Sequence, residues 1–132
     1  MSTFKNIDEA REFFTGDTFA KANGIVIVEL WEDGCLCSME LRDVHRNAVG
    51  GVMGGVIFTL GDFAFAVASN NVHMTTVAQQ VSISFLSGSR GSRLFARAKC
   101  RKDGRTSCVY NIDITDDLGR DVAQFIGTGY KR

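Results

Sequence analysis

The sequence predicts an α+β domain in which one antiparallel β-sheet wraps around a long central helix. The first observation is the length, because 132 residues are enough for one hydrophobic core and too few for two independent ones. The second is a nearly continuous apolar segment in the middle of the chain. The third is that β-rich segments with turn residues between them flank it, two before and four after. Residues 1–132 therefore form a single domain.

The part before the centre predicts one helix and a hairpin. Residues 7–14 (IDEAREFF) have the pattern of a short amphipathic helix, with two acidic residues early enough to favour the helix dipole. Residues 24–30 (GIVIVEL) are rich in Val and Ile and predict a strand. A turn at residues 32–34 and a second strand at residues 35–44 complete an antiparallel hairpin.

The central segment predicts a glycine-rich loop followed by a buried helix. Residues 50–55 read GGVMGG, and residues 56–69 are nearly all apolar, with helical spacing of Val56, Leu60, Phe63, Ala64 and Val67. The segment is long enough to suggest a membrane crossing. Asp62 at its centre, its glycines and the lack of an aromatic belt argue against one. We expect a core helix and no membrane partner.

The rest of the chain predicts four strands, at residues 75–86, 93–101, 106–115 and 122–130. Turn residues separate them at positions 87–89, 103–104 and 116–119.

Composition limits the function classes. Fifteen Lys and Arg balance fifteen Asp and Glu, so without a basic block there is no reason to expect nucleic-acid or anionic-membrane binding. The polar N-terminal segment lacks a secretory signal, which predicts a cytoplasmic protein. The four cysteines lack the CxxC spacing of metal or redox sites, so we expect buried free thiols and no metal.

Asp62 is the first candidate for chemistry, because it is the only formally charged residue between positions 47 and 89. On a helix, apolar and small residues lie one turn before and after it. Burying such a carboxylate costs several kcal/mol unless it is hydrogen-bonded or its pKa rises. We interpret Asp62 as a general base or nucleophile in a dry cleft. The alternative is a structural aspartate bonded to a loop backbone.

Asn47 and the glycine loop are the second candidate. The start of a helix presents unpaired N–H groups and a partial positive charge. Glycines at 54 and 55 allow a substrate carbonyl to approach those groups, as an oxyanion hole requires, with Asn47 as a positioning group. The alternative is that the glycines only permit tight packing of helix on sheet.

The spacing of these candidates predicts a dimer. Gly54 and Asp62 are eight residues apart, which is roughly 12 Å along one helix. One chain therefore cannot bring both to the same carbonyl, and each site needs two chains.

Residues 45–62 (HRNAVGGVMGGVIFTLGD) resemble the signature HxNxxGxxHGGxxFxLxD of hotdog-fold thioesterases of the phenylacetate-degradation (PaaI-like) branch. Residues 84–86, 103–105 and 123–129 are also similar to the later strands of that family. The resemblance implies a hotdog fold and hydrolysis of aryl- or medium-chain acyl-coenzyme A. It implies no cofactor, and a site between two subunits of a homodimer or a dimer of dimers (a homotetramer).

The same resemblance assigns roles to residues. It implies that Asp62 is the base or nucleophile and that Asn47 and the Gly54 N–H orient and polarise the thioester carbonyl. Met53 stands where the family usually has His, and the sequence SGSR at 87–90 replaces a usual Arg-Pro pair. The expected substrate-binding residues are His45, Met53, Gly55, Thr76 (or a neighbour up to residue 78), Arg90 and Arg105.

Several of these roles have plainer alternatives. His45 can be structural, and the basic residues that are candidates for the coenzyme A phosphates can be simply solvated. A non-catalytic acyl-coenzyme A-binding protein is the alternative to an enzyme, although a pure binder gains nothing from a buried carboxylate. A hotdog hydratase or dehydratase is disfavoured, because its motifs contain proline and this chain has none.

Overall fold

A computed structural model describes residues 2–132, so only the first residue of the predicted domain lies outside it. The helices are α1 (Ile7–Phe14), α2 (Thr18–Ala22) and α3 (Gly54–Val72), with a 3₁₀ turn, η1 (Asp43–His45). The strands are β1 (Val26–Trp31), β2 (Gly34–Glu40), β3 (Thr76–Phe85), β4 (Arg93–Asp103), β5 (Ser107–Asp116) and β6 (Asp121–Lys131).

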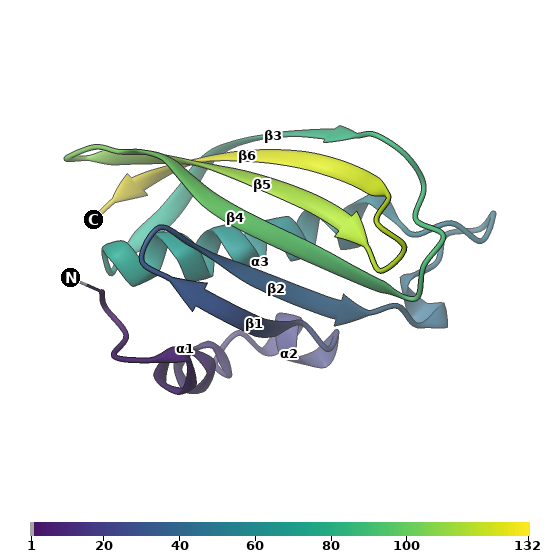
Figure 1. Cartoon of the computed structure of the whole chain (residues 1–132), viewed down its shortest axis with the longest axis horizontal. Helices are drawn as coiled ribbons and strands as arrows, with labels where there is room; N and C mark the ends of the chain where they lie inside the picture. The colour runs from purple at the N-terminus through teal and green to yellow at the C-terminus, as the bar shows by residue number, and fades with distance from the viewer. Residues whose placement is uncertain (1) are drawn as a thin grey trace.

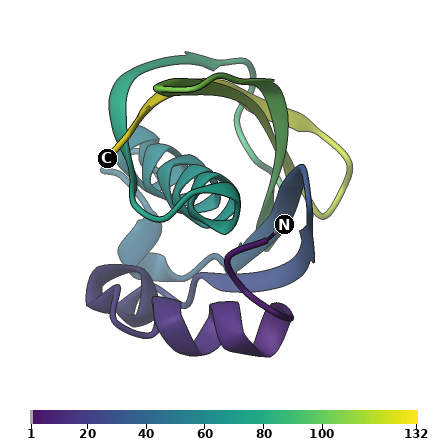
Figure 2. The same ribbon diagram turned by 90° about the vertical axis from the view of Figure 1, so that its left-hand side faces the viewer.

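One six-stranded sheet, in the order β1-β2-β4-β5-β6-β3, curves around α3 (Figures 1 and 2). All of its neighbouring strands pair antiparallel. The short helices α1 and α2 lie on the open side, below β1 in Figure 1. The predicted architecture is therefore confirmed.

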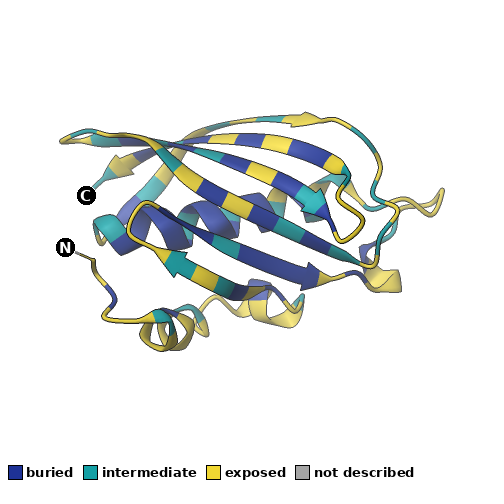
Figure 3. Ribbon diagram, viewed as in Figure 1, coloured by how far each residue is buried: buried dark blue, intermediate teal, exposed yellow. Residues whose placement is uncertain are grey.

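Close approach of α3 to the sheet depends on glycines. A Cβ atom at Gly127 or Gly129 would lie within 2.8 Å of the Phe65 ring, and one at Gly61 would lie 2.6 Å from Phe125. The buried side chains of the strands alternate with exposed ones along the sheet (Figure 3). By length and composition α3 could cross a membrane, but 61% of its apolar window is buried inside this domain.

Three local predictions differ from the structure. The second strand was expected to reach residue 44 but ends at Glu40, because the chain turns into η1, where His45 Nδ1 accepts a hydrogen bond from the Arg42 N–H. Helix α2 was not predicted, since five residues carry no periodic signal. Three of the four free cysteines are buried as expected, but Cys100 is partly exposed.

Asp116, at the end of β5, fastens the β3–β4 loop to the β5–β6 turn. Its buried carboxylate accepts hydrogen bonds from the backbone N–H groups of Arg90, Gly91, Leu118 and Arg120. Burial alone would raise its pKa, but these donors outweigh burial and lower the pKa to about 2. The loop that carries Arg90 is thus held by an ionised side chain.

We expect Asp116→Ala to lower the free energy of unfolding by roughly 2 kcal/mol, because four partly buried backbone donors lose their acceptor at once. The native carboxyl has a pKa below its ordinary 3.8, so its stabilisation is complete above that pH and is lost as the pH falls toward 2. Urea unfolding between pH 7 and pH 2 measures both effects. Asp113→Ala, on the exposed face of the same strand, is the control and should change stability by less than about 0.5 kcal/mol. Equal stability of the two variants would contradict the prediction.

Candidate active site

The loop before α3 folds back on itself as a small backbone ladder. The Met53 N–H donates to His45 O at 2.9 Å, and the Asn47 N–H donates to Gly51 O at 2.7 Å. Gly50 closes the turn with a φ of 86°, a conformation that side chains other than glycine rarely adopt. The predicted glycine-rich loop is therefore a defined turn that ends at the first residue of the helix.

Asn47 organises this turn with its side chain. Its Oδ1 accepts hydrogen bonds from the N–H groups of Val49 (3.1 Å) and Gly51 (3.0 Å). Its Nδ2 donates to no acceptor within residues 2–132, and the residue is exposed. Fixed through its oxygen, the amide keeps two N–H bonds available for a ligand beside the start of α3.

The first two amides of α3 are also available. The N–H groups of Val56 and Ile57 donate back to Met53 O, whereas those of Gly54 and Gly55 have no acceptor in the described chain. Gly54 lies beneath Phe85, whose Cζ would be 3.1 Å from an added Cβ. Free backbone donors at the positive end of a long helix suit a developing oxyanion.

Asp62 lies two turns along α3, on the helix face turned away from the sheet. It follows Gly55 and Thr59 on a line of partly exposed residues, each three or four positions apart. Its carboxylate has no hydrogen-bond partner among the described residues, so the alternative of a structural aspartate bonded to a loop backbone has no support. Burial raises its pKa above the ordinary 3.8, and the negative charge of Asp17 adds to this rise.

Two cavities flank this helix face. The Asp62 cavity, of about 210 Å³, is lined by Asp17, Phe19, Ala20, Phe58, Thr59, Asp62, Phe63 and Ala66. The Met53 cavity, of about 430 Å³, is lined by Phe19, Asn23, Ile25, Met39, Val44, His45, Met53, Gly55, Val56 and Thr59. Phe19 and Thr59 line both cavities and form the wall between them. The predicted residues Met53 and Gly55 thus share one cavity at the start of α3.

His45 is enclosed, and both of its ring nitrogens are used within the chain. Nδ1 accepts from the Arg42 N–H at 3.0 Å, so Nε2 carries the proton and donates to Asn23 Oδ1 at 3.1 Å. Burial, followed by the charges of Arg42 and Arg46, lowers its pKa, so the ring is neutral at pH 7. The geometry gives His45 a structural role at the floor of the Met53 cavity.

Thr76 lies away from both cavities. It follows the far end of α3, which at 19 residues is roughly 27 Å long. There its hydroxyl donates to His73 O and its N–H donates to Asn70 Oδ1. Within one chain, this placement does not bring the expected substrate-binding residue to the start of α3.

The two candidate arginines lie at opposite ends of the sheet. Arg90 is on the loop before β4, and Arg105 is on the turn after it. The 11 residues of β4 separate them by roughly 33 Å. Arg90 is at the end where Phe85 covers Gly54, so only Arg90 lies near the start of α3 in the same chain.

Sequence reasoning missed Asp17, Phe19 and Asn23, which come from α2 and its caps. The one available signal was Asp17, whose side chain accepts a hydrogen bond from the Ala20 N–H as an N-cap. Gly54 and Asp62 remain on one straight helix, so a single chain does not unite them at one point.

Comparisons with known proteins identify the family of the chain. Residues 49–123 match the family model described as Thioesterase superfamily. Over 123 residues, the chain is 33% identical to the acyl-coenzyme A thioesterase PaaI of Escherichia coli K12, which covers 92% of this chain and 88% of that protein.

Solved structures agree as well. The structure of E. coli PaaI superposes with a TM-score of 0.89 at 31% identity, over 95% of this chain and 91% of that one. The crystal structure of a hypothetical thioesterase protein from Streptococcus pneumoniae TIGR4 with coenzyme A gives a TM-score of 0.82 at 25% identity, covering 89% of this chain and 94% of that one. This chain belongs to the thioesterase superfamily and is a PaaI-like thioester hydrolase with the hotdog fold.

Proposed function

We propose that the protein hydrolyses acyl-coenzyme A to a free acid and coenzyme A. The observation that carries the proposal is Asp62, a half-buried carboxylate with no hydrogen-bond partner in residues 2–132, on the helix whose first amides are free. The similarity to a coenzyme A thioesterase and to a thioesterase solved with coenzyme A supports the choice of thioester.

In the proposed reaction, the thioester oxygen accepts a hydrogen bond from the Gly54 N–H, and the Asn47 side-chain amide orients the carbonyl. Asp62 of the partner subunit removes a proton from a water molecule, whose oxygen attacks the carbonyl carbon. Alternatively, this carboxylate attacks directly and water then hydrolyses the anhydride. In both routes the C–S bond breaks and coenzyme A leaves as the thiolate. The reaction needs no cofactor or metal.

A homodimer that joins β3 to β3 is the second part of the proposal. β3 is an edge strand with the sequence TVAQQVSISF, which lacks the charges and prolines that usually protect exposed edges. Phe85 at its end and Phe58 on the open face of α3 are 56% and 37% exposed, so apolar surface continues beside this edge. Outward-facing Ile126 and Tyr130 on β6 are also exposed and suit the pairing of dimers into a tetramer.

For the nucleotide part of coenzyme A, the proposal assigns Arg90 to a phosphate. Its place on the anchored β3–β4 loop, at the Gly54 end of the sheet, supports this role. Arg105 lies at the other end of the sheet. It would contact the nucleotide only if dimer formation placed it beside coenzyme A bound at the Gly54 end of the partner subunit.

A panel of acyl-coenzyme A thioesters, assayed by release of free thiol, tests the proposal. We expect the wild-type protein to hydrolyse at least one coenzyme A ester that has an apolar acyl group. Binding of coenzyme A esters without any hydrolysis would instead favour the non-catalytic alternative.

Met53→His tests whether the departure from the family pattern matters. Met53 precedes α3 as its N-cap residue, with extended backbone and no side-chain cap hydrogen bond, and 46% of its surface is exposed beside the Met53 cavity. Because the Gly54 amide and Asp62 are unchanged, kcat should change by less than about tenfold, and KM should respond more because the cavity wall changes. Val44→Ala, in the same cavity, is the control. A gain in kcat of more than about a hundredfold would show that the missing imidazole is catalytic.

A further inference from the structure

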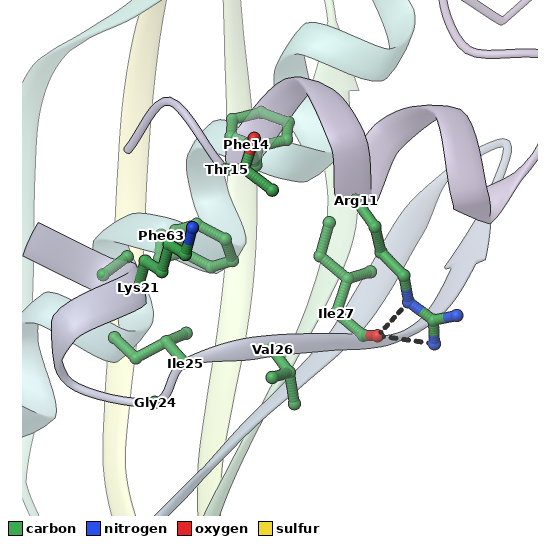
Figure 4. A pocket seen from close by; sticks show the side chains of 10 residues that line it. Arg11, Phe14, Thr15, Lys21, Gly24, Ile25, Val26, Ile27 and Phe63 are labelled. Atoms are coloured by element: carbon green, nitrogen blue, oxygen red, sulfur yellow. Dashed lines mark hydrogen bonds between the residues drawn. The ribbon is translucent and has the colours of Figure 1, made fainter. Parts of the chain in front are cut away.

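Three hollows surround α2, and they differ in charge. The Asp62 cavity contains two carboxylates, those of Asp17 and Asp62. On the other side of Ala20 and Phe63, the Arg11 groove, of about 270 Å³, is lined by Arg11, Phe14, Thr15, Ala20, Lys21, Gly24, Ile25, Val26, Ile27 and Phe63. Figure 4 shows that Arg11 in this groove turns its guanidinium to the Ile27 carbonyl, with contacts of 2.8 and 3.0 Å.

The Met53 cavity, by contrast, has no formally charged lining residue within the described chain. Its one titratable side chain, His45, is neutral because burial lowers its pKa. An ionised group that entered this cavity would lose water and meet no opposite charge, which is a costly transfer.

The polar side chains of the Met53 cavity are already hydrogen-bonded inside the protein. Asn23 accepts from His45 Nε2 and donates from its Nδ2 to Phe19 O at 3.0 Å. The Thr59 hydroxyl donates to Gly55 O at 2.8 Å. These bonds leave the Thr59 oxygen, the second Asn23 N–H and the Gly55 N–H able to bind a neutral polar group, but none of these groups carries a charge that could offset an ionised one.

The cavity adjoins the proposed reaction centre. Gly55, whose N–H is free, and Met53 line it, so it opens beside the amides that polarise the carbonyl. Its volume of about 430 Å³ lies within the usual range for small-molecule sites. Phe19, 65% exposed, closes it toward the Asp62 cavity.

We infer that the Met53 cavity holds the acyl group of the substrate, that it selects uncharged acyl groups, and that Phe19 limits their length. This inference rests on the proposed function for the position of the carbonyl. It identifies the substrate class as thioesters of uncharged alkanoyl or arylalkanoyl acids. It also assigns specificity to α2 through Phe19.

The test measures binding and hydrolysis separately. Binding constants come from calorimetry with the Asp62→Asn protein, and kcat/KM comes from wild-type protein. The probes are coenzyme A esters of hexanoate, 6-hydroxyhexanoate, adipate (as the monothioester) and dodecanoate. We expect the binding constant and kcat/KM for hexanoyl to exceed those for the charged adipoyl ester by about 100-fold or more, whereas 6-hydroxyhexanoyl should stay closer to hexanoyl.

Phe19→Ala should join the two cavities and raise binding and kcat/KM for dodecanoyl relative to hexanoyl by about tenfold or more. Phe13→Ala is the matched control, because Phe13 is also an exposed phenylalanine, 54% exposed on α1, but lines none of these three hollows. Thermal unfolding checks that both variants are folded.

The outcomes separate the two proposals. Selective binding without turnover would contradict the proposed hydrolysis but support the assignment of the acyl pocket. Turnover that favours the charged ester, or a chain-length preference that Phe19→Ala leaves unchanged, would overturn the inference without affecting the proposed thioesterase function.

Discussion

Asp62→Asn is expected to lower kcat for acyl-coenzyme A hydrolysis by about 10²- to 10⁴-fold without lowering the unfolding temperature. An amide can neither take a proton from water nor form an anhydride, so both routes of the proposed reaction fail. The shape and volume of the side chain are nearly unchanged. Asp113→Asn, on the exposed face of the sheet, is the control and should keep wild-type activity. Full activity of Asp62→Asn would remove this residue from the mechanism.

The same substitution is expected to maintain or increase stability at pH 7. Because the pKa of Asp62 is raised by folding, the native state holds its proton more tightly than the unfolded state does. The contribution of the Asp62 carboxyl to the free energy of unfolding therefore falls as the pH rises from the ordinary pKa of 3.8 through the raised native pKa. At neutral pH the ionised carboxylate opposes folding, and asparagine has no such charge. Thermal unfolding of both proteins at pH 7 measures the difference, and a clearly less stable variant would indicate a structural role.

Activity should follow the opposite trend with pH. Only ionised Asp62 can act as base or nucleophile, so kcat/KM should fall as the pH drops through the raised pKa of this carboxyl. The acidic limb of the profile should lie above the pH at which an exposed aspartate titrates. A rate that stays constant down to pH 4 would contradict this assignment.

Most of the fold could be predicted because its signals are local. The first helix has the predicted bounds, and the central helix extends the predicted segment by two residues at its start and three at its end. Its apolar residues recur with helical period over more than three turns, which few other structures produce. The end of β2 was missed because the His45 ring captures the Arg42 N–H, a contact that no pattern in residues 40–45 indicates.

The candidate site was predictable only in part. Asp62 and the free amide at Gly54 could be found because one is an isolated charge and the other begins a helix after glycines. The walls around them could not be predicted, because they come from α2, η1 and β2, which meet only in three dimensions. Thr76 shows the converse problem: it lies near the motif in sequence, yet α3 places it at the end of the helix opposite Gly54.

Gly54→Pro removes the proposed oxyanion donor and should leave the helix intact. Gly54 is the first residue of α3, where proline is favoured, and Met53 before it already has the extended backbone (φ −60°, ψ 136°) that a following proline requires. We expect a loss of about 10²- to 10³-fold in kcat. Gly54→Ala is the matched control, since it crowds Phe85 in the same way but keeps the N–H group.

Mixing Gly54→Pro chains with Asp62→Asn chains should restore activity that neither protein has alone. On one helix these positions lie roughly 12 Å apart, so the proposed site combines the Gly54 amide of one subunit with Asp62 of the partner subunit. In a mixed dimer, one of the two sites then has both groups intact and the other has neither. After random exchange at equal concentrations, half of the dimers are mixed, and about one quarter of wild-type activity should return. Mass spectrometry of the intact complex verifies the exchange. Mixed dimers without recovered activity would mean that each site lies within a single chain.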